Sequence, residues 1–244
     1  IPDSEVSVSV WHYFRRLYGP FTVNYATKIN GVNCCYELDD QNKPLAMRLN
    51  LRHKIQEMRD DNALDHVNEG RPVTVPMKKG TRLELAETVN PKLLSQYRKL
   101  YGQLIWITTN VRQDTDYYRV ALGTIMSKPS ISAYQHLCNY GKFICDTQFW
   151  DHVLRLDKAE PRYVVYVDSS YANAELIGRS NMYTVQTYMY GMLIEQKTST
   201  SRTQPHVGAA EYIGLNDATL RTSRWINILV HLLPHKSQTS VCRR

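Results

Sequence analysis

The chain has 244 residues, of which 43% are apolar and 22% are charged, and its formal net charge is +7. This length fits one large domain or two small ones, at roughly 100–200 residues per domain. No run reaches the roughly 18 apolar residues of a membrane span, and the five cysteines contain no CxxC pair, which argues against a zinc ribbon or a disulfide framework. We therefore expect an intracellular protein with reduced thiols and no membrane partner. The positive charge is compatible with nucleic acid as a partner.

Residues 1–70 are predicted to form a small α+β piece. Strand-like runs lie at 21–26, 32–38 and 45–51, with an Asn-Gly turn signal at 30–31 and a second turn over 39–44. A short helix is predicted over 53–62. Residues 71–90 carry two prolines and a glycine among mixed charges, which predicts an extended connector and a domain boundary.

Residues 91–156 are predicted to form three helices. Apolar residues recur at steps of three and four from Tyr97 to Thr108 and again from Tyr118 to Met126. A third helix begins near Ser130 or Ser132 as N-cap and runs through Cys145. Short joints between the helices favour antiparallel packing.

Residues 161–244 carry two carboxylates at positions expected to avoid water. The run 163–167 is β-branched and aromatic, which predicts a strand with both faces buried, and Asp168 ends it. Strands follow near 182–189 and 192–197, then a long helix over about 206–233, with Glu211 at the N-terminal end of its apolar stripe. A buried carboxylate is costly unless it is paired, so the two acids are candidate ligands of a hard divalent cation. Alternatively, Asp168 caps a turn and Glu211 is a first-turn acid stabilised by the helix dipole.

This order of strand, hairpin and helix resembles the ribonuclease H domain of reverse transcriptases, in particular the copia-type LTR retrotransposons. "YVVYVDSSYAN" resembles the family's opening Tyr-x-Asp-Ala-Asp-Trp-Ala, and "AAEY" within the long helix resembles its Ser-Ser-Thr-Glu-Ala-Glu-Tyr. "RPVTVPM" resembles the Pro-Val-x-Thr-Pro-Met joint after the polymerase palm. "YRKLYGQLIWI" and the helices after it resemble the segment before the ribonuclease domain. The resemblance covers about residues 20–233.

The resemblance implies an α+β fold in four parts. Residues 1–70 would be the end of a palm and thumb, 71–90 a connector, 91–156 a helical thumb or connection, and 161–244 a ribonuclease H-like mixed sheet with a covering helix, incomplete at its C-terminus. Asp168 and Glu211 map to the first two ligands of Mg²⁺ or Mn²⁺. The implied partners are an RNA–DNA hybrid or other nucleic acid and the rest of the Pol polyprotein, in the cytoplasm (in virus-like particles) and the nucleus.

The chain departs from the family pattern at its other acidic positions. Ser170 replaces a second acid close to Asp168, and Arg243 stands where the third ligand is expected. A cation is repelled by Arg243, so we expect poor or no cleavage by this chain alone. Since the chain begins at Ile1 rather than Met, we expect a fragment or a piece cut from a longer polypeptide, and the lost acids suggest a degenerate copy.

Three other functions match parts of the sequence. A haloacid dehalogenase-type phosphatase would need an acid where Ser170 stands. A zinc site at His231 and His235 is interrupted by Pro234, with only Cys242 nearby. The serious alternative is a non-catalytic nucleic-acid-binding or scaffold relic, with Tyr97, Tyr101 and Tyr117 for base stacking. Its phosphate-binding side chains would be the basic residues of the three predicted helices, unless these merely form a solvated face: Arg98, Lys99, Arg112, Arg119, Lys128 and Lys142.

Overall fold

The protein is an α+β chain in a computed structural model that describes residue 16 and residues 27–78, 80–155, 163–170, 181–189, 192–201 and 207–232. Its contacts divide the chain into two compact units, one of residues 27–214 and one of residues 1–26 together with 215–244. Among the described residues, no helix combines the length and the apolar character needed to cross a membrane.

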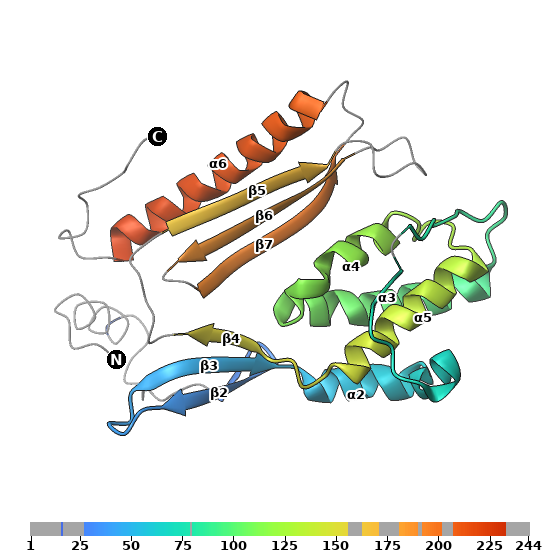
Figure 1. The fold of residues 1–244 in the computed structure, drawn as a ribbon, viewed down its shortest axis with the longest axis horizontal. Coiled ribbons are helices and arrows are strands. Elements are labelled where there is room, and N and C mark those ends of the chain that lie inside the picture. Colours follow the sequence, from blue (N-terminus) through green and yellow to red (C-terminus); the bar gives the residue numbers. More distant parts are fainter. Residues whose placement is uncertain are drawn as a thin grey trace. The chain divides into compact units, whose positions relative to one another are not determined.

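The first sheet is antiparallel, in the order β1-β2-β3-β4, and Figure 1 shows β2, β3 and β4 next to one another. Its strands are β1 (Lys28–Ile29), β2 (Val32–Leu38), β3 (Pro44–Asn50) and β4 (His152–Arg155). Asn30 and Gly31 both have positive φ, 47° and 83°, as a tight turn between twisted strands requires. The strand predicted at 32–38 is confirmed, and the one predicted at 45–51 lies one residue earlier. The strand predicted at 21–26 lies outside the described residues.

The turn between β2 and β3 is held by one side chain. Oδ1 of Asp39 accepts hydrogen bonds from the backbone N–H groups of Gln41 and Lys43, both at 2.8 Å. Asn42 adopts a left-handed conformation with φ of 60°, which asparagine tolerates better than most residues. The predicted turn over 39–44 is thereby confirmed.

Helices make up most of residues 52–146. They are α2 (Arg52–Asp61), the 3₁₀ segment η1 (Leu64–Gly70), α3 (Pro91–Asn110), the 3₁₀ segment η2 (Gln113–Thr115), α4 (Asp116–Gly123) and α5 (Ile131–Asp146). The side chain of Asn90 caps α3 by accepting from the N–H groups of Lys92 and Leu93. Of the two predicted caps for α5, Ser130 is the one used, and its Oγ accepts from the N–H of Ala133. The three predicted helices are confirmed.

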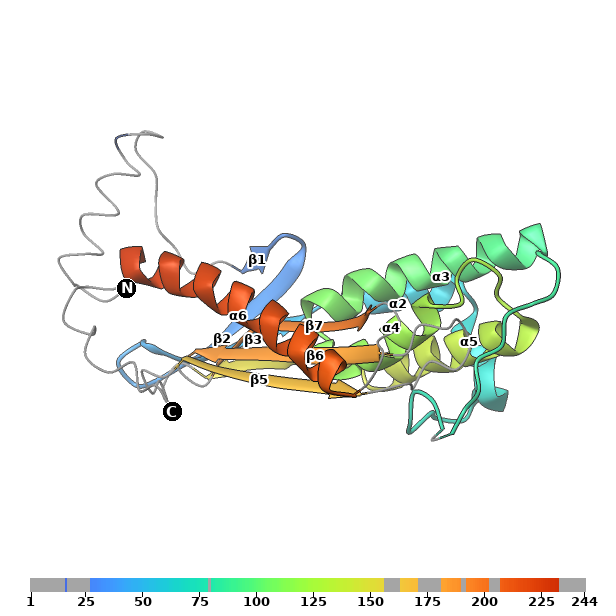
Figure 2. The ribbon, with the colours of Figure 1, turned by 90° about the horizontal axis from the view of Figure 1, so that it is seen from above.

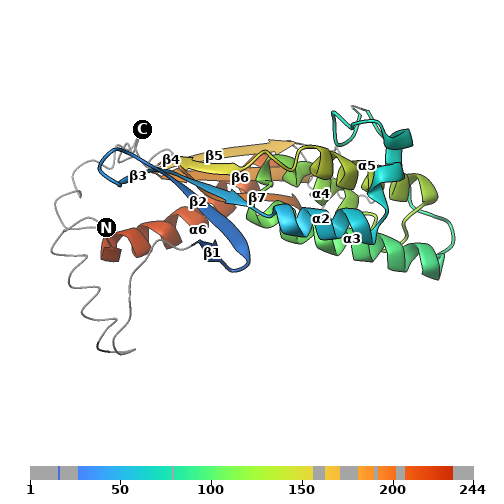
Figure 3. The same cartoon turned by 90° about the horizontal axis from the view of Figure 1, so that it is seen from below.

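One hydrophobic core joins the two sides of the predicted connector. Leu51, Ile55, Met58 and Leu64 come from before residue 71, and they cluster with buried side chains of α3, α4 and α5. Figure 3 shows α2 running alongside α3. The described residues between 71 and 90 form no helix or strand, and a single bridge joins Leu85 to Pro129. The segment is irregular, as predicted, but the segments that it connects fold against each other.

The C-terminal elements are a three-stranded sheet and a long helix. The strands are β5 (Tyr163–Ser170), β6 (Asn181–Met189) and β7 (Met192–Ser201), and α6 (Val207–Leu232) follows. Both strand pairs are antiparallel, with β6 in the middle (Figure 2). The three strands and the helix lie where the sequence predicted them. A mixed sheet was also expected, but every pair of described strands is antiparallel.

Candidate functional site

Asp168 is the sixth of the eight residues of β5 and stands opposite Thr184 of β6. Its side chain is exposed, Tyr166 is 61% exposed, and Val164, Val165 and Val167 are only half-buried. The sequence-based expectation of a strand buried on both faces is therefore wrong. An exposed carboxylate loses little hydration on folding, so Asp168 needs no partner to offset a cost of burial. Water and dissolved cations reach its carboxylate freely.

Glu211 lies in the second turn of α6 and is also exposed. The stripe that was expected to face a core is largely exposed, with Leu215 at 58% and Ile226 at 45%. Among the stripe residues whose burial is described, Ala218 is the buried one, at 3% exposed. The prediction that Glu211 is on a core-facing stripe is thus wrong, because the apolar spacing of the helix does not by itself decide which face is covered.

Metal binding is limited by the number of acidic ligands. Among the described residues, no group of three or more His, Cys, Asp or Glu side chains is gathered closely enough to hold a metal ion. Two carboxylates are still within the usual requirement of Mg²⁺, which is bound through one or two carboxylates and completes its shell with water and substrate phosphates.

Arg112 has an internal role in the helical core. Its side chain is 2% exposed, and its guanidinium donates to both carboxylate oxygens of Asp114 at 3.0 and 2.9 Å. Nη1 also donates to the carbonyl and to Oγ1 of Thr147, at 3.3 and 2.8 Å. The guanidinium lies over the rings of Phe143 and Trp150, 5.7 and 5.5 Å from their centroids. The predicted phosphate-binding role does not suit a buried side chain whose donors are used inside the protein.

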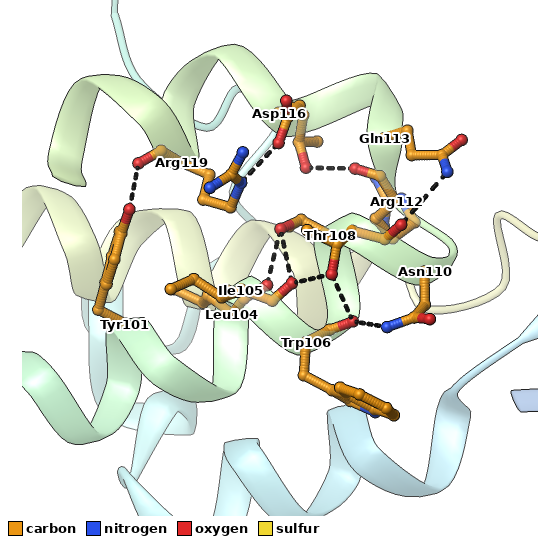
Figure 4. A network of polar contacts seen from close by, with 12 residues as sticks. Tyr101, Leu104, Ile105, Trp106, Thr108, Asn110, Arg112, Gln113, Asp116 and Arg119 are labelled. Atoms are coloured by element: carbon orange, nitrogen blue, oxygen red, sulfur yellow. Dashed lines mark hydrogen bonds and ion pairs between the residues drawn. The ribbon is translucent and has the colours of Figure 1, made fainter. Parts of the chain in front are cut away.

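Arg119 and Lys142 are likewise bound to carboxylates. Nε of Arg119 donates to Asp116 at 2.5 Å, one helical turn away (Figure 4). Burial by itself would lower the pKa of Arg119, but the hydrogen bond and negative charge of Asp116 raise it above its usual value. Lys142 is buried and contacts Asp146 at 2.7 Å. Asp146 also accepts from the N–H of Val73 at 2.8 Å, so this pair fastens the connector to α5.

The other three predicted basic residues remain at the surface. Arg98, Lys99 and Lys128 are all exposed. Nζ of Lys99 lies 3.5 Å from the carboxylate of Asp61 and donates to its backbone carbonyl at 3.2 Å. Exposed pairs of this kind are weak, so the ammonium group stays available to a stronger anion.

Two of the three predicted stacking tyrosines belong to the core. Tyr97 is fully buried and its hydroxyl donates to the carbonyl of Leu122 at 2.8 Å. Tyr101 donates to the carbonyl of Arg119 at 3.0 Å, and burial raises its pKa. Only Tyr117, at 48% exposed, presents its ring to solvent. The buried pair fixes α4 against α3 through hydrogen bonds to backbone carbonyls.

A groove between α2 and α3 was missed by the sequence analysis. It has a volume of about 560 Å³ and is lined by Lys54, Glu57, Lys99, Gly102, Gln103, Trp106 and Ile107. Four of these residues recur along α3 at offsets of 0, 3, 4 and 7 from Lys99, on one face of the helix. The sequence analysis used the periodic apolar stripe of α3, which marks its buried face. The polar and aromatic residues that line the groove lie off that stripe, so the stripe did not identify them.

Comparison of the chain with protein-family models, with curated proteins and with solved structures finds no match.

Proposed function

We propose that this chain is part of a copia-type reverse transcriptase and ribonuclease H polyprotein, and that it binds RNA–DNA hybrid with Asp168 and Glu211 as ligands of one Mg²⁺ or Mn²⁺ ion. The observation that supports this most is the order of the C-terminal elements. An antiparallel meander with an exposed aspartate in its first strand is followed by a long helix with an exposed glutamate near its start.

The proposed roles follow from the chemistry of the two carboxylates. Each offers anionic oxygens that replace water around a hard cation. A cation held there would supply positive charge for a phosphate of the hybrid. Two carboxylates support one ion rather than the pair, roughly 3.5–4 Å apart, that clamps attacking and leaving oxygens in two-metal hydrolysis. Binding of the hybrid is therefore the proposed activity, and hydrolysis should be slow or absent.

The experiment measures hybrid binding and RNA cleavage with the full chain in Mg²⁺, in Mn²⁺ and in EDTA. Binding should strengthen with the metal, and Asp168→Asn and Glu211→Gln should each remove that gain. Asp40→Asn is a matched control, because Asp40 is an exposed acid in the turn between β2 and β3. Equal binding with and without metal, or equal losses in all three variants, would refute the metal-ligand roles.

A second candidate function is binding of nucleic acid without a metal. It is favoured by the three exposed basic residues Arg98, Lys99 and Lys128 and by the net charge of +7. Such binding depends steeply on salt, because neutralised phosphates release their counterions. Binding that persists in EDTA and falls steeply between about 50 and 200 mM salt would favour this function over the metal-dependent one.

A further inference from the structure

The groove between α2 and α3 contains a tryptophan that is neither buried nor used in the core. Trp106 is 44% exposed, and in Figure 4 its ring points away from Arg119 and Asp116, which lie on the α4 side of α3. The turn between β1 and β2 passes near one edge of the ring, since a Cβ atom built on Gly31 would lie 3.9 Å from Cζ2 of the indole. The ring therefore has the turn on one side and offers part of its surface to a ligand.

Gly102 keeps the groove open next to this ring. It lies one turn before Trp106 on α3, and a Cβ atom built there would meet nothing within 4 Å. The groove volume of about 560 Å³ falls in the range of roughly 300–1,000 Å³ that small-molecule sites occupy. The opening is therefore large enough for a planar group to lie against the indole.

Both walls of the groove carry an ammonium group. Lys54 belongs to α2 and Lys99 to α3, and their side chains are 44% and 53% exposed. Each contacts one carboxylate, at 2.6 Å for Glu57 and 3.5 Å for Asp61. Exposed ion pairs contribute little, so a phosphate can displace them. Lys99 and Trp106 are seven positions apart, which is roughly 10 Å along the helix at about 1.5 Å per residue.

We propose that this groove binds one nucleotide unit of single-stranded nucleic acid, with the base stacked on Trp106 and the adjoining phosphates near Lys54 and Lys99. Aromatic platforms beside cationic side chains are how proteins bind single strands without reading their sequence. The net charge of +7 attracts such a polyanion toward the surface. The site involves neither Asp168 nor Glu211, so it adds a second contact to the proposed hybrid binding and does not depend on metal.

The experiment uses the full chain and a 12-residue oligothymidylate in low salt, with affinity measured by fluorescence anisotropy and stacking by quenching of tryptophan emission. Gly102→Leu fills the groove but leaves Trp106 in place, and Trp106→Ala removes the platform. Each should weaken binding about tenfold or more, as expected for the loss of one stacked base. Phe149→Ala is the control, because Phe149 is an exposed aromatic residue after α5 that does not line the groove; the affinity of this variant should stay within about twofold.

Tryptophan quenching and the affinity for oligothymidylate together decide whether the groove binds a nucleotide unit. The proposal is supported if oligothymidylate quenches the tryptophan emission of the wild-type chain but not that of Gly102→Leu. Circular dichroism and the urea midpoint check that the variants are folded. Because residue 102 is exposed on a helix, Gly102→Leu keeps the test informative even where Trp106→Ala perturbs the fold. Absence of oligothymidylate binding, or equal affinity in Gly102→Leu and wild type, overturns the proposal. If the groove proposal fails but hybrid binding remains metal-dependent, the proposed function still stands. Asp168→Asn distinguishes the two proposals, because it should weaken metal-dependent hybrid binding and leave oligothymidylate binding unchanged.

Discussion

Replacing Arg112 with alanine should destabilise the helical part of the chain by about 3 kcal/mol. The guanidinium makes four hydrogen bonds, two to Asp114 and two to Thr147. Hydrogen bonds to charged groups contribute about 1.5–3 kcal/mol each. Asp114 is 49% exposed, so water replaces much of what that carboxylate loses. The rest of the expected loss of about 3 kcal/mol comes from the hydrogen bond to the Thr147 carbonyl and from the cation–π contacts with Phe143 and Trp150. Such contacts contribute about 0.5–1 kcal/mol at exposed sites.

Urea denaturation followed by circular dichroism measures this change. Arg98→Ala is the matched control, because Arg98 is an exposed arginine of α3 and exposed substitutions usually change stability by less than about 0.5 kcal/mol. In thermal unfolding the difference corresponds to about 6–12 °C, at roughly 2–4 °C per kcal/mol for a domain of this size. Equal denaturation midpoints for Arg112→Ala and Arg98→Ala would refute the structural role of Arg112.

Three further predictions concern glycines and titratable groups. Gly102→Ala should stabilise the chain by about 1 kcal/mol in urea, since it removes glycine from an open helical position. Gly123→Ala should destabilise it by about 1–3 kcal/mol, as overpacking does, because its Cβ would come within van der Waals overlap of the Tyr101 hydroxyl; equal effects of the two alanines would contradict the packing. Burial raises the pKa of Cys145 from 9.0 to about 11 and that of Tyr134 from 10.0 to about 12. The folded state favours the neutral form of both groups, so their contribution to the free energy of unfolding should be constant below about pH 9 and fall between pH 9 and 12; a flat profile from pH 9 to 12 would contradict their burial.

Local signals in the sequence located most of the secondary structure. The Asn30–Gly31 pair and the alternation after it fixed the hairpin, because only a few residues accept positive φ at both central turn positions. Ser130 and Asn90 precede their helices and cap them through side-chain oxygens. These elements depend on neighbours in the chain, so they could be predicted without knowing the tertiary fold. The segment η1 could not, since Asn68 and Glu69 adopt left-handed φ of 56° and 54° without a glycine.

The candidate site was less predictable, because burial is a property of the whole fold. Arg112 and Lys142 were candidates for a solvated face, yet both side chains are buried and paired with the carboxylates of Asp114 and Asp146. Asp168 follows a strongly apolar run but is exposed, since strand propensity does not tell whether a second layer covers the strand. Trp106 lies off the apolar stripe that marked the core-facing side of α3, so the periodic pattern did not single it out.

The shared core of residues 27–155 has a consequence for how this region responds to a cut chain. Leu64 and its neighbours precede the irregular stretch, whereas their packing partners Leu100 and Leu137 follow it. β4 also hydrogen-bonds to β3 from about a hundred residues away. A protease that nicks the backbone between 71 and 90 therefore creates two polypeptides that stay bound without a covalent link. Expressed as separate genes, the two halves should reassemble as a split protein.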